Sequence, residues 1–311
     1  MPNARSSARQ GPLPPQRHAM LVALIKGLRP RQWAKNVFVF AGLFFDGKAL
    51  RPVHLLHSMA AFVIFSLVSG AIYLVNDLRD IENDRLHPTK RLRPLPSGTL
   101  KVGVARAAAC ALLLVSLPSA FLMGTSFGLT VIGYTVMMIA YSFYLKRVVI
   151  VDVMVIAAGF VLRVVAGALV VAVARFSPWL YMCTTLLALF IALNRRRHEL
   201  VLLQNLANGH RSVLDDYSLE FIDSATSLVT ATAVVSYSLY TFSAPNLPQN
   251  HAMMLTIPFV LYGVFRYLFL IHVKRLGGTP EDLVLGDRPL LLTMILWGLT
   301  AGIVIYGSHL F

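Results

Sequence analysis

Long apolar windows recur along nearly the whole chain, which rules out most water-soluble folds. Windows long enough to cross the hydrocarbon core of a bilayer lie at residues 55–75, 104–124, 126–145, 149–173, 177–194, 222–243, 252–272 and 289–309. A weaker window between residues 20 and 45 contains several basic residues and Pro30, which should divide it into an interfacial piece and a spanning piece. The sequence therefore predicts an all-α, polytopic membrane protein, a bundle of about nine transmembrane helices.

The composition supports this interpretation. The 311 residues are 57% hydrophobic and only 14% charged, with a mean hydropathy of +0.67, as in proteins that cross a membrane repeatedly. Residues 1–19, rich in Pro, Ser and Arg, should form a disordered cytoplasmic N-terminus, and residues 20–311 a single transmembrane helical domain. Cys110 and Cys183 fall within apolar windows, so neither a disulfide framework nor a zinc site is indicated.

The net charge of +14 is divided unevenly between the two sides of the predicted bundle. With the N-terminus placed inside, the outer side holds only Lys48, Arg51 and Arg175, while Arg163 and Arg266 fall within windows. All other lysines and arginines lie on the inner side, as the positive-inside rule requires. The basic excess therefore predicts topology, with the long basic loops in the cytoplasm, and no nucleic-acid-binding module.

An acidic motif from Asn76 to Asp84 directly follows the window at 55–75. On a continuous helix Asp77, Asp80 and Asp84 would lie within a sector of about 60°, with Asn76 beside them. Carboxylates repel one another at this spacing and are unfavourable at a helix C-terminus, so helix stability does not explain them. A divalent cation does explain them, because Mg2+ prefers hard oxygen ligands. The alternative, a solvated acidic loop after a membrane span, stays open.

Basic residues follow the acidic motif on the same side of the predicted membrane. Lys90, Arg91 and Arg93 lie in a proline-rich loop, where cations can hold phosphate oxygens. Lys146 lies at the end of the window at 126–145, shortly after Tyr141. Each of these cations is also explained as part of a loop that sets topology.

Two charged residues fall within one apolar window. Asp152 and Arg163 are about 16 Å apart along a helix, so they cannot pair, but both could line one polar cavity. Ionisable groups at membrane depth are rare and usually functional.

The loop after the window at 177–194 carries further charges. Arg197 and Glu199 lie at its start, and Asp216 and Glu220 stand one helical turn apart further on. The second pair predicts an acidic helix face, a weaker metal signal than the first motif. A solvated surface explains it nearly as well.

Through these residues, the chain resembles the UbiA superfamily of intramembrane prenyltransferases. The signature NDxxDxxxD is matched in full by Asn76, Asp77, Asp80 and Asp84, and Arg93–Gly98 resembles the next conserved element with one extra residue. The chain also resembles one branch of this superfamily, the polyprenyl-phosphate phosphoribosyltransferases. The segments that carry this resemblance are Arg29–Asn36, Leu145-Lys146 followed by Asp152, Gly159–Arg163 and Arg196–Glu199. Asp216-x-x-x-Glu220 stands where aromatic prenyltransferases have a second aspartate pair, which favours this branch.

The resemblance implies Mg2+-dependent transfer of the 5-phosphoribosyl group from phosphoribosyl diphosphate to decaprenyl or another polyprenyl phosphate, with release of diphosphate. This reaction serves the lipid-linked arabinose donor of arabinogalactan in the cell wall. The implied location is the plasma membrane of a bacterium, multi-pass, among membrane lipids and with the active site facing the cytoplasm; a homo-oligomer stays open. An aromatic prenyltransferase that uses a prenyl diphosphate, and an anion transporter, remain as alternatives.

The resemblance also implies roles for individual residues. The metal ligands would be Asn76, Asp77, Asp80 and Asp84, and the catalytic residues Asp77, Asp80, Asp84, Lys146 and Arg163. The substrate-binding residues would be Lys35, Asn76, Arg91, Arg93, Tyr141, Lys146, Asp152, Arg163, Arg197 and Glu199.

Overall fold

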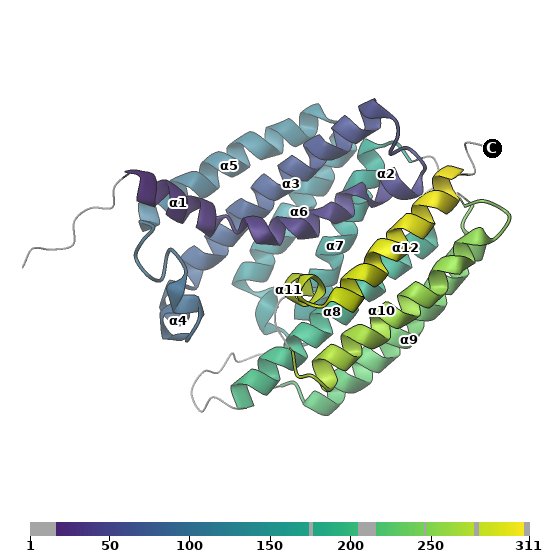
Figure 1. Cartoon of the computed structure of the whole chain (residues 1–311). Coiled ribbons are helices and arrows are strands. Elements are labelled where there is room, and N and C mark those ends of the chain that lie inside the picture. The colour runs from purple at the N-terminus through teal and green to yellow at the C-terminus, as the bar shows by residue number, and fades with distance from the viewer. Residues whose placement is uncertain (1–16, 174–176, 205–215, 246, 277–279, 308–311) are drawn as a thin grey trace, which may run out of the picture.

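The computed structural model describes residues 17–173, 177–204, 216–245, 247–276 and 280–307, and every regular element within these ranges is a helix (Figure 1). The α-helices are α1 Arg17–Gly27, α2 Ala41–Phe45, α3 Pro52–Arg79, α4 Ile81–Leu86, α5 Val102–Leu122, α6 Thr125–Phe143, α7 Val151–Val170, α8 Pro178–Gln204, α9 Leu219–Ser243, α10 Ile257–His272, α11 Pro280–Gly286 and α12 Arg288–Gly307. Short 3-10 helices are η1 Pro30–Phe40, η2 Lys90–Leu92, η3 Leu145–Arg147 and η5 Ala252–Thr256. The all-α prediction is confirmed.

The expected disordered segment 1–19 lies mostly outside the described residues. Helix α1 begins within that segment, at Arg17.

Within the described ranges, six helices are long and apolar enough to cross a membrane. These are α3, α5, α6, α7, Ala252–His272 and α12. The windows at 177–194 and 222–243 also form long helices, α8 and α9, but neither is among the six. Charged residues from Arg195 to Glu199 in α8, and many Ser and Thr residues in α9, lower their hydropathy. The prediction of about nine spanning helices is therefore not confirmed.

The first window is broken at the predicted position. Arg29 has a left-handed backbone conformation (φ 53°), and Pro30 then begins the 3-10 helix η1. The indole Nε1 of Trp33 donates to the Leu28 carbonyl oxygen at 3.1 Å and ties η1 back to the end of α1. Proline cannot continue the hydrogen-bond ladder of α1, which explains the break. The break turns the chain so that Arg29 faces the end of α3.

The backbone of helix α7 packs very closely against the backbone of the η1–α2 segment. A Cβ atom at Gly167 would stand 1.8 Å from the Val39 carbonyl oxygen, and one at Gly42 would stand 2.9 Å from Cα of Ala168. No side chain fits at either position, so the Ala166-Gly167-Ala168 sequence is what lets the two backbones meet.

The long helices form one continuous series of contacts. Helix α3 packs against α5, α6 and α7, while α8 packs against α7 and α9, and α10 against α12 (Figure 1). Because successive spans alternate in direction, the ends of α3, α6, α8 and α10 and the starts of α7 and α9 share one end of the bundle. The acidic motif and most basic loops gather at this end.

Candidate active site

The acidic motif stands where α3 ends. Helix α3 stops at Arg79, Asp80 lies between helices, and α4 begins at Ile81. The expectation of one uninterrupted helix through Asp84 is therefore corrected. The backbone N–H of Asp80 still donates to Asn76 O at 3.0 Å and that of Asp84 to Asp80 O at 2.8 Å. The helical path is bent at Asp80 rather than lost.

Asp77 and Asp84 are both buried and share a cation. Arg93 Nη1 lies 3.3 Å from Asp77 Oδ1 and 2.7 Å from Asp84 Oδ2. Arg29 also donates to Asp77 Oδ1, and its guanidinium stacks on the Tyr73 ring. Burial, with Arg29 close by, lowers the pKa of the Arg93 guanidinium. Burial thus disfavours the positive charge of Arg93, and its partners Asp77 and Asp84 partly offset that effect.

Asp80 has a different cation. Lys146 Nζ, from η3 at the end of α6, lies 2.5 Å from Asp80 Oδ2 and 3.3 Å from the Asn76 amide oxygen. Lys146 is buried, so its ammonium is directed at the motif and not at solvent. The sequence prediction that Lys146 belongs with the acidic motif agrees with this arrangement.

Together, three carboxylates meet three cations, and we call this set, Asp77, Asp80, Asp84, Arg29, Arg93 and Lys146, the charged cluster. In the part of the chain that the structure describes, no three His, Cys, Asp or Glu side chains form a group that could hold a metal ion as they stand. The donor set nevertheless fits a hard divalent cation, because it consists of carboxylate and amide oxygens. Two pairs of these ligands already converge, Asp77 with Asp84 on Arg93 and Asp80 with Asn76 on Lys146.

Two predicted phosphate-binding residues show no described contact with the charged cluster. Lys35 Nζ donates to Gln32 Oε1 at 2.6 Å within η1. Arg91 is exposed at the surface in η2. Of these two arginines, Arg93 is the one that contacts the carboxylates.

Asp152 belongs to a second, enclosed network. Arg196 Nε lies 2.6 Å from Asp152 Oδ2, and the Tyr217 hydroxyl donates to Asp152 Oδ1 at 2.8 Å. Arg196 also donates to Glu199 and, at 3.2 Å, to the Tyr141 hydroxyl. The predicted substrate-binding residues Tyr141, Asp152 and Glu199 thus meet one another through Arg196. We call this set the buried network.

Arg163 belongs to a third network. Its guanidinium donates to Asn36 Oδ1 at 2.8 Å, to the Gly159 carbonyl oxygen at 2.7 Å and to the Tyr134 hydroxyl at 2.7 Å. Asn36 in turn donates to Ser66 Oγ at 3.1 Å. These bonds join η1, α3, α6 and α7, and no described bond links Arg163 to the charged cluster. Asp152 and Arg163 therefore have separate partners instead of a common polar cavity.

The second acidic pair does not form a helix face. Ser218 caps α9, accepting from the Phe221 N–H at 3.0 Å, so the helix begins at Leu219 and Asp216 lies outside it. Asp216 and Glu220 are both exposed. Arg197, predicted to bind substrate, pairs instead with Asp223 of α9 at 2.7 Å.

Sequence reasoning did not assign site roles to Arg29 or Arg196. Both are joined to their carboxylates across long stretches of chain, and no local pattern encodes that pairing. The Arg29-Pro30 pair held a usable signal, because a basic residue at a predicted helix break is free to turn toward the neighbouring helix.

A bundle of apolar helices with a mixed acidic and basic cluster at one end has the form of a membrane-embedded enzyme for anionic substrates. The chain belongs to the UbiA prenyltransferase family, whose pattern matches residues 36–199. Membership favours an enzyme over an anion transporter.

Relatives match over nearly the whole chain. A decaprenyl-phosphate phosphoribosyltransferase of Mycobacterium tuberculosis is 34% identical over 91% of this chain and 94% of its own length. Another protein of that name, from Corynebacterium glutamicum, is 31% identical over 93% of this chain and 88% of its own. A solved UbiA homolog from Archaeoglobus fulgidus, bound to GPP and Mg2+, superposes with a TM-score of 0.70 at 20% identity, covering 91% of this chain and 99% of that one. The last comparison supports the fold.

Proposed function

We propose that this protein transfers the 5-phosphoribosyl group of phosphoribosyl diphosphate to decaprenyl phosphate and releases diphosphate. The relatives named for this activity, 31–34% identical over most of both chains, support the choice of reaction. The structural observation that carries the proposal is the charged cluster, in which Arg29, Arg93 and Lys146 face the three carboxylates of the motif.

The chemistry matches these residues. An oxygen of the lipid phosphate attacks the anomeric carbon of the ribose, while the bond from that carbon to the diphosphate oxygen breaks and its electron pair leaves with the diphosphate. The lipid phosphate is already an anion at neutral pH, so no strong general base is needed. The protein must bring two anionic substrates together and offset their charge, and Arg29, Arg93 and Lys146 are suited to holding phosphate oxygens.

A divalent metal completes the proposal. Asn76, Asp77, Asp80 and Asp84 would hold it, and when bound it would neutralise negative charge on the diphosphate. The same four residues also have a role before a metal binds. They hold Arg93 and Lys146 at the end of α3, so the cations stand ready for substrate phosphates. The Mg2+ bound to the Archaeoglobus fulgidus homolog is consistent with a metal of this class.

The basic loops support a cytoplasmic orientation for the charged cluster, since positive charge collects on the inner side of membranes. A cytoplasmic site suits a water-soluble sugar diphosphate. In this proposal the product feeds the lipid-linked arabinose donor of the cell wall.

The test uses purified full-length protein with labelled phosphoribosyl diphosphate, decaprenyl phosphate and Mg2+. We expect label to enter the organic phase and to stop doing so in EDTA. If no label moves, but a prenyl diphosphate is consumed with an aromatic acceptor, the family assignment stands and the proposed reaction is wrong.

A further inference from the structure

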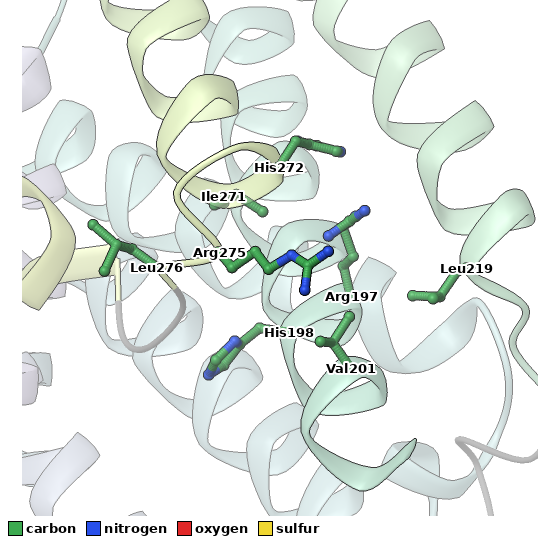
Figure 2. A pocket seen from close by; sticks show the side chains of 8 residues that line it. All are labelled: Arg197, His198, Val201, Leu219, Ile271, His272, Arg275 and Leu276. Carbon is green, nitrogen blue, oxygen red and sulfur yellow. The ribbon is translucent and has the colours of Figure 1, made fainter. Parts of the chain in front are cut away.

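A second basic site lies at the same end of the bundle, between the end of α8, the start of α9 and the end of α10. A cavity of about 340 Å³ opens there, and its polar walls are Arg197, His198, His272 and Arg275 (Figure 2). In the described part of the chain, none of these four side chains bonds to a member of the charged cluster. The cavity is therefore a separate candidate site.

Among the described side chains, the positive charge of the cavity walls exceeds the negative charge of the carboxylates beside them. Asp223 pairs with Arg197, with Nε at 2.7 Å from Oδ1, and lies 3.4 Å from His272 Nε2. No carboxylate among the described side chains pairs with Arg275. Figure 2 shows the Arg275 guanidinium reaching across the cavity toward that of Arg197. Two guanidinium groups that face one space repel each other unless an anion lies between them.

Arg275 lines the cavity from the turn that follows α10. Arg275 has a left-handed conformation (φ 52°) just after α10, a position that usually takes glycine. The chain on either side is tied back to α10, with Lys274 N–H donating to Phe269 O at 3.1 Å and Leu276 N–H to Leu270 O at 3.0 Å. The turn thus fixes the backbone position from which the exposed Arg275 side chain extends.

The remaining walls are apolar, from Val201, Leu219, Ile271 and Leu276. We propose that this cavity binds a phosphate group, held between the guanidinium groups of Arg197 and Arg275, with the apolar walls contacting the rest of the ligand. A guanidinium group can donate two parallel hydrogen bonds to two phosphate oxygens. It therefore both offsets the charge of a phosphate and fixes its orientation. The phosphate belongs either to the headgroup of an anionic membrane lipid or to a soluble phosphate compound.

The site does not depend on the proposed transfer reaction, so its test measures binding. Full-length protein in a neutral detergent with EDTA is unfolded by heat at rising ligand concentration. One arm adds inorganic diphosphate. The other adds short-chain phosphatidylglycerol, compared with short-chain phosphatidylcholine. EDTA suppresses metal-dependent phosphate binding at the charged cluster.

Three variants separate a specific site from general basicity. Arg275→Gln removes the guanidinium, and Arg275→Gly removes it while suiting the left-handed backbone, so that a loss of binding in the glycine variant does not reflect poor folding. Lys274→Gln is the matched control, because Lys274 is exposed, adjacent and outside the cavity walls.

We expect the unfolding midpoint of the unmodified protein to rise with ligand in at least one arm. The apparent Kd should be roughly tenfold weaker in both Arg275 variants and nearly unchanged in Lys274→Gln. A rise only with phosphatidylglycerol identifies a lipid headgroup, and a rise only with diphosphate identifies a soluble phosphate. No rise in either arm, equal binding by the Arg275 variants, or an equal loss in Lys274→Gln would overturn the proposal.

Discussion

The charged cluster and the buried network both contain ion pairs between basic side chains and carboxylates, but the two sets differ in how far their side chains are exposed to water. In the buried network the side chains of Asp152 and Arg196 are 0% and 2% exposed, so both charges are enclosed. In the charged cluster the Asp77 side chain is 2% exposed, but Arg29 and Arg93 are 23% and 28% exposed. Arg29 and Arg93 can therefore exchange a carboxylate for a substrate anion while still in contact with water, whereas Lys146 is buried. Asp152 and Arg196 cannot exchange partners without leaving a buried charge unpaired, so we expect this pair to stabilise the fold.

The largest expected effect is on the buried network. Arg196→Leu leaves Asp152 buried without its cation, and we expect the free energy of unfolding to fall by about 3–5 kcal/mol. Thermal or denaturant unfolding in detergent measures this change. Arg195→Leu, on the same helix but with a side chain 44% exposed, is the control and should change stability little. An equal loss of stability in the two variants would show that the enclosed pair of Asp152 and Arg196 contributes no more to the free energy of unfolding than an exposed residue does.

The next effect is on turnover. Asp77→Asn keeps the size of the side chain but removes a charge from the cluster, and we expect the rate to fall roughly 100- to 1,000-fold with the protein still folded. Label transfer and the unfolding midpoint are measured on the same sample. Glu82→Gln is the matched control from the same motif, since Glu82 is exposed and bonds only to Arg85 among described residues. Full activity of Asp77→Asn would refute the role of the motif.

A smaller effect is expected at Tyr217, which lies at the edge of the buried network and should make stability depend on pH. The Tyr217 hydroxyl donates to Asp152 Oδ1 and accepts from the Ile150 N–H at 2.7 Å. Burial, together with the hydrogen bond to Asp152, raises the pKa of Tyr217 from 10.0 to about 12. A raised pKa means that Tyr217 contributes its full stability below pH 10 and loses it as pH rises toward about 12.

Tyr217→Phe should therefore lower the free energy of unfolding by about 1–2 kcal/mol at neutral pH. The difference between the two proteins should narrow between pH 10 and about 12, the range over which Tyr217 titrates. Unfolding curves at several pH values measure it. A difference that stays constant over this range would mean that the hydroxyl does not act through its protonated form.

The smallest effect is expected at Arg91, which lies outside the charged cluster. Arg91 is two positions from Arg93 but is exposed, so Arg91→Gln should change stability by no more than about 0.5 kcal/mol. We expect turnover within a few-fold of the unmodified protein, against a much larger loss for Arg93→Gln. A collapse of turnover in Arg91→Gln would place Arg91 in the substrate-binding set.

Local patterns predicted the helices and the acidic motif, because hydropathy and spacing act within a few turns. The break at Pro30 followed from the same kind of rule. The individual ion pairs across the bundle were not predicted, because Arg29 lies 48 positions from Asp77 and Lys146 lies 66 from Asp80. The resemblance grouped Lys146 with the acidic motif but did not pair it with Asp80. One local signal was overlooked. Ser218 is a favourable N-cap, and reading it as the start of α9 would have separated Asp216 from Glu220.

The contact at Gly167 closes one seam between the helices to a lipid. The Val39 carbonyl oxygen occupies the space where even a methyl group would stand, so backbone rests on backbone along this seam. A seam closed so tightly has no room for a hydrocarbon chain. In the proposed reaction, a polyprenyl tail would therefore have to enter between other helices.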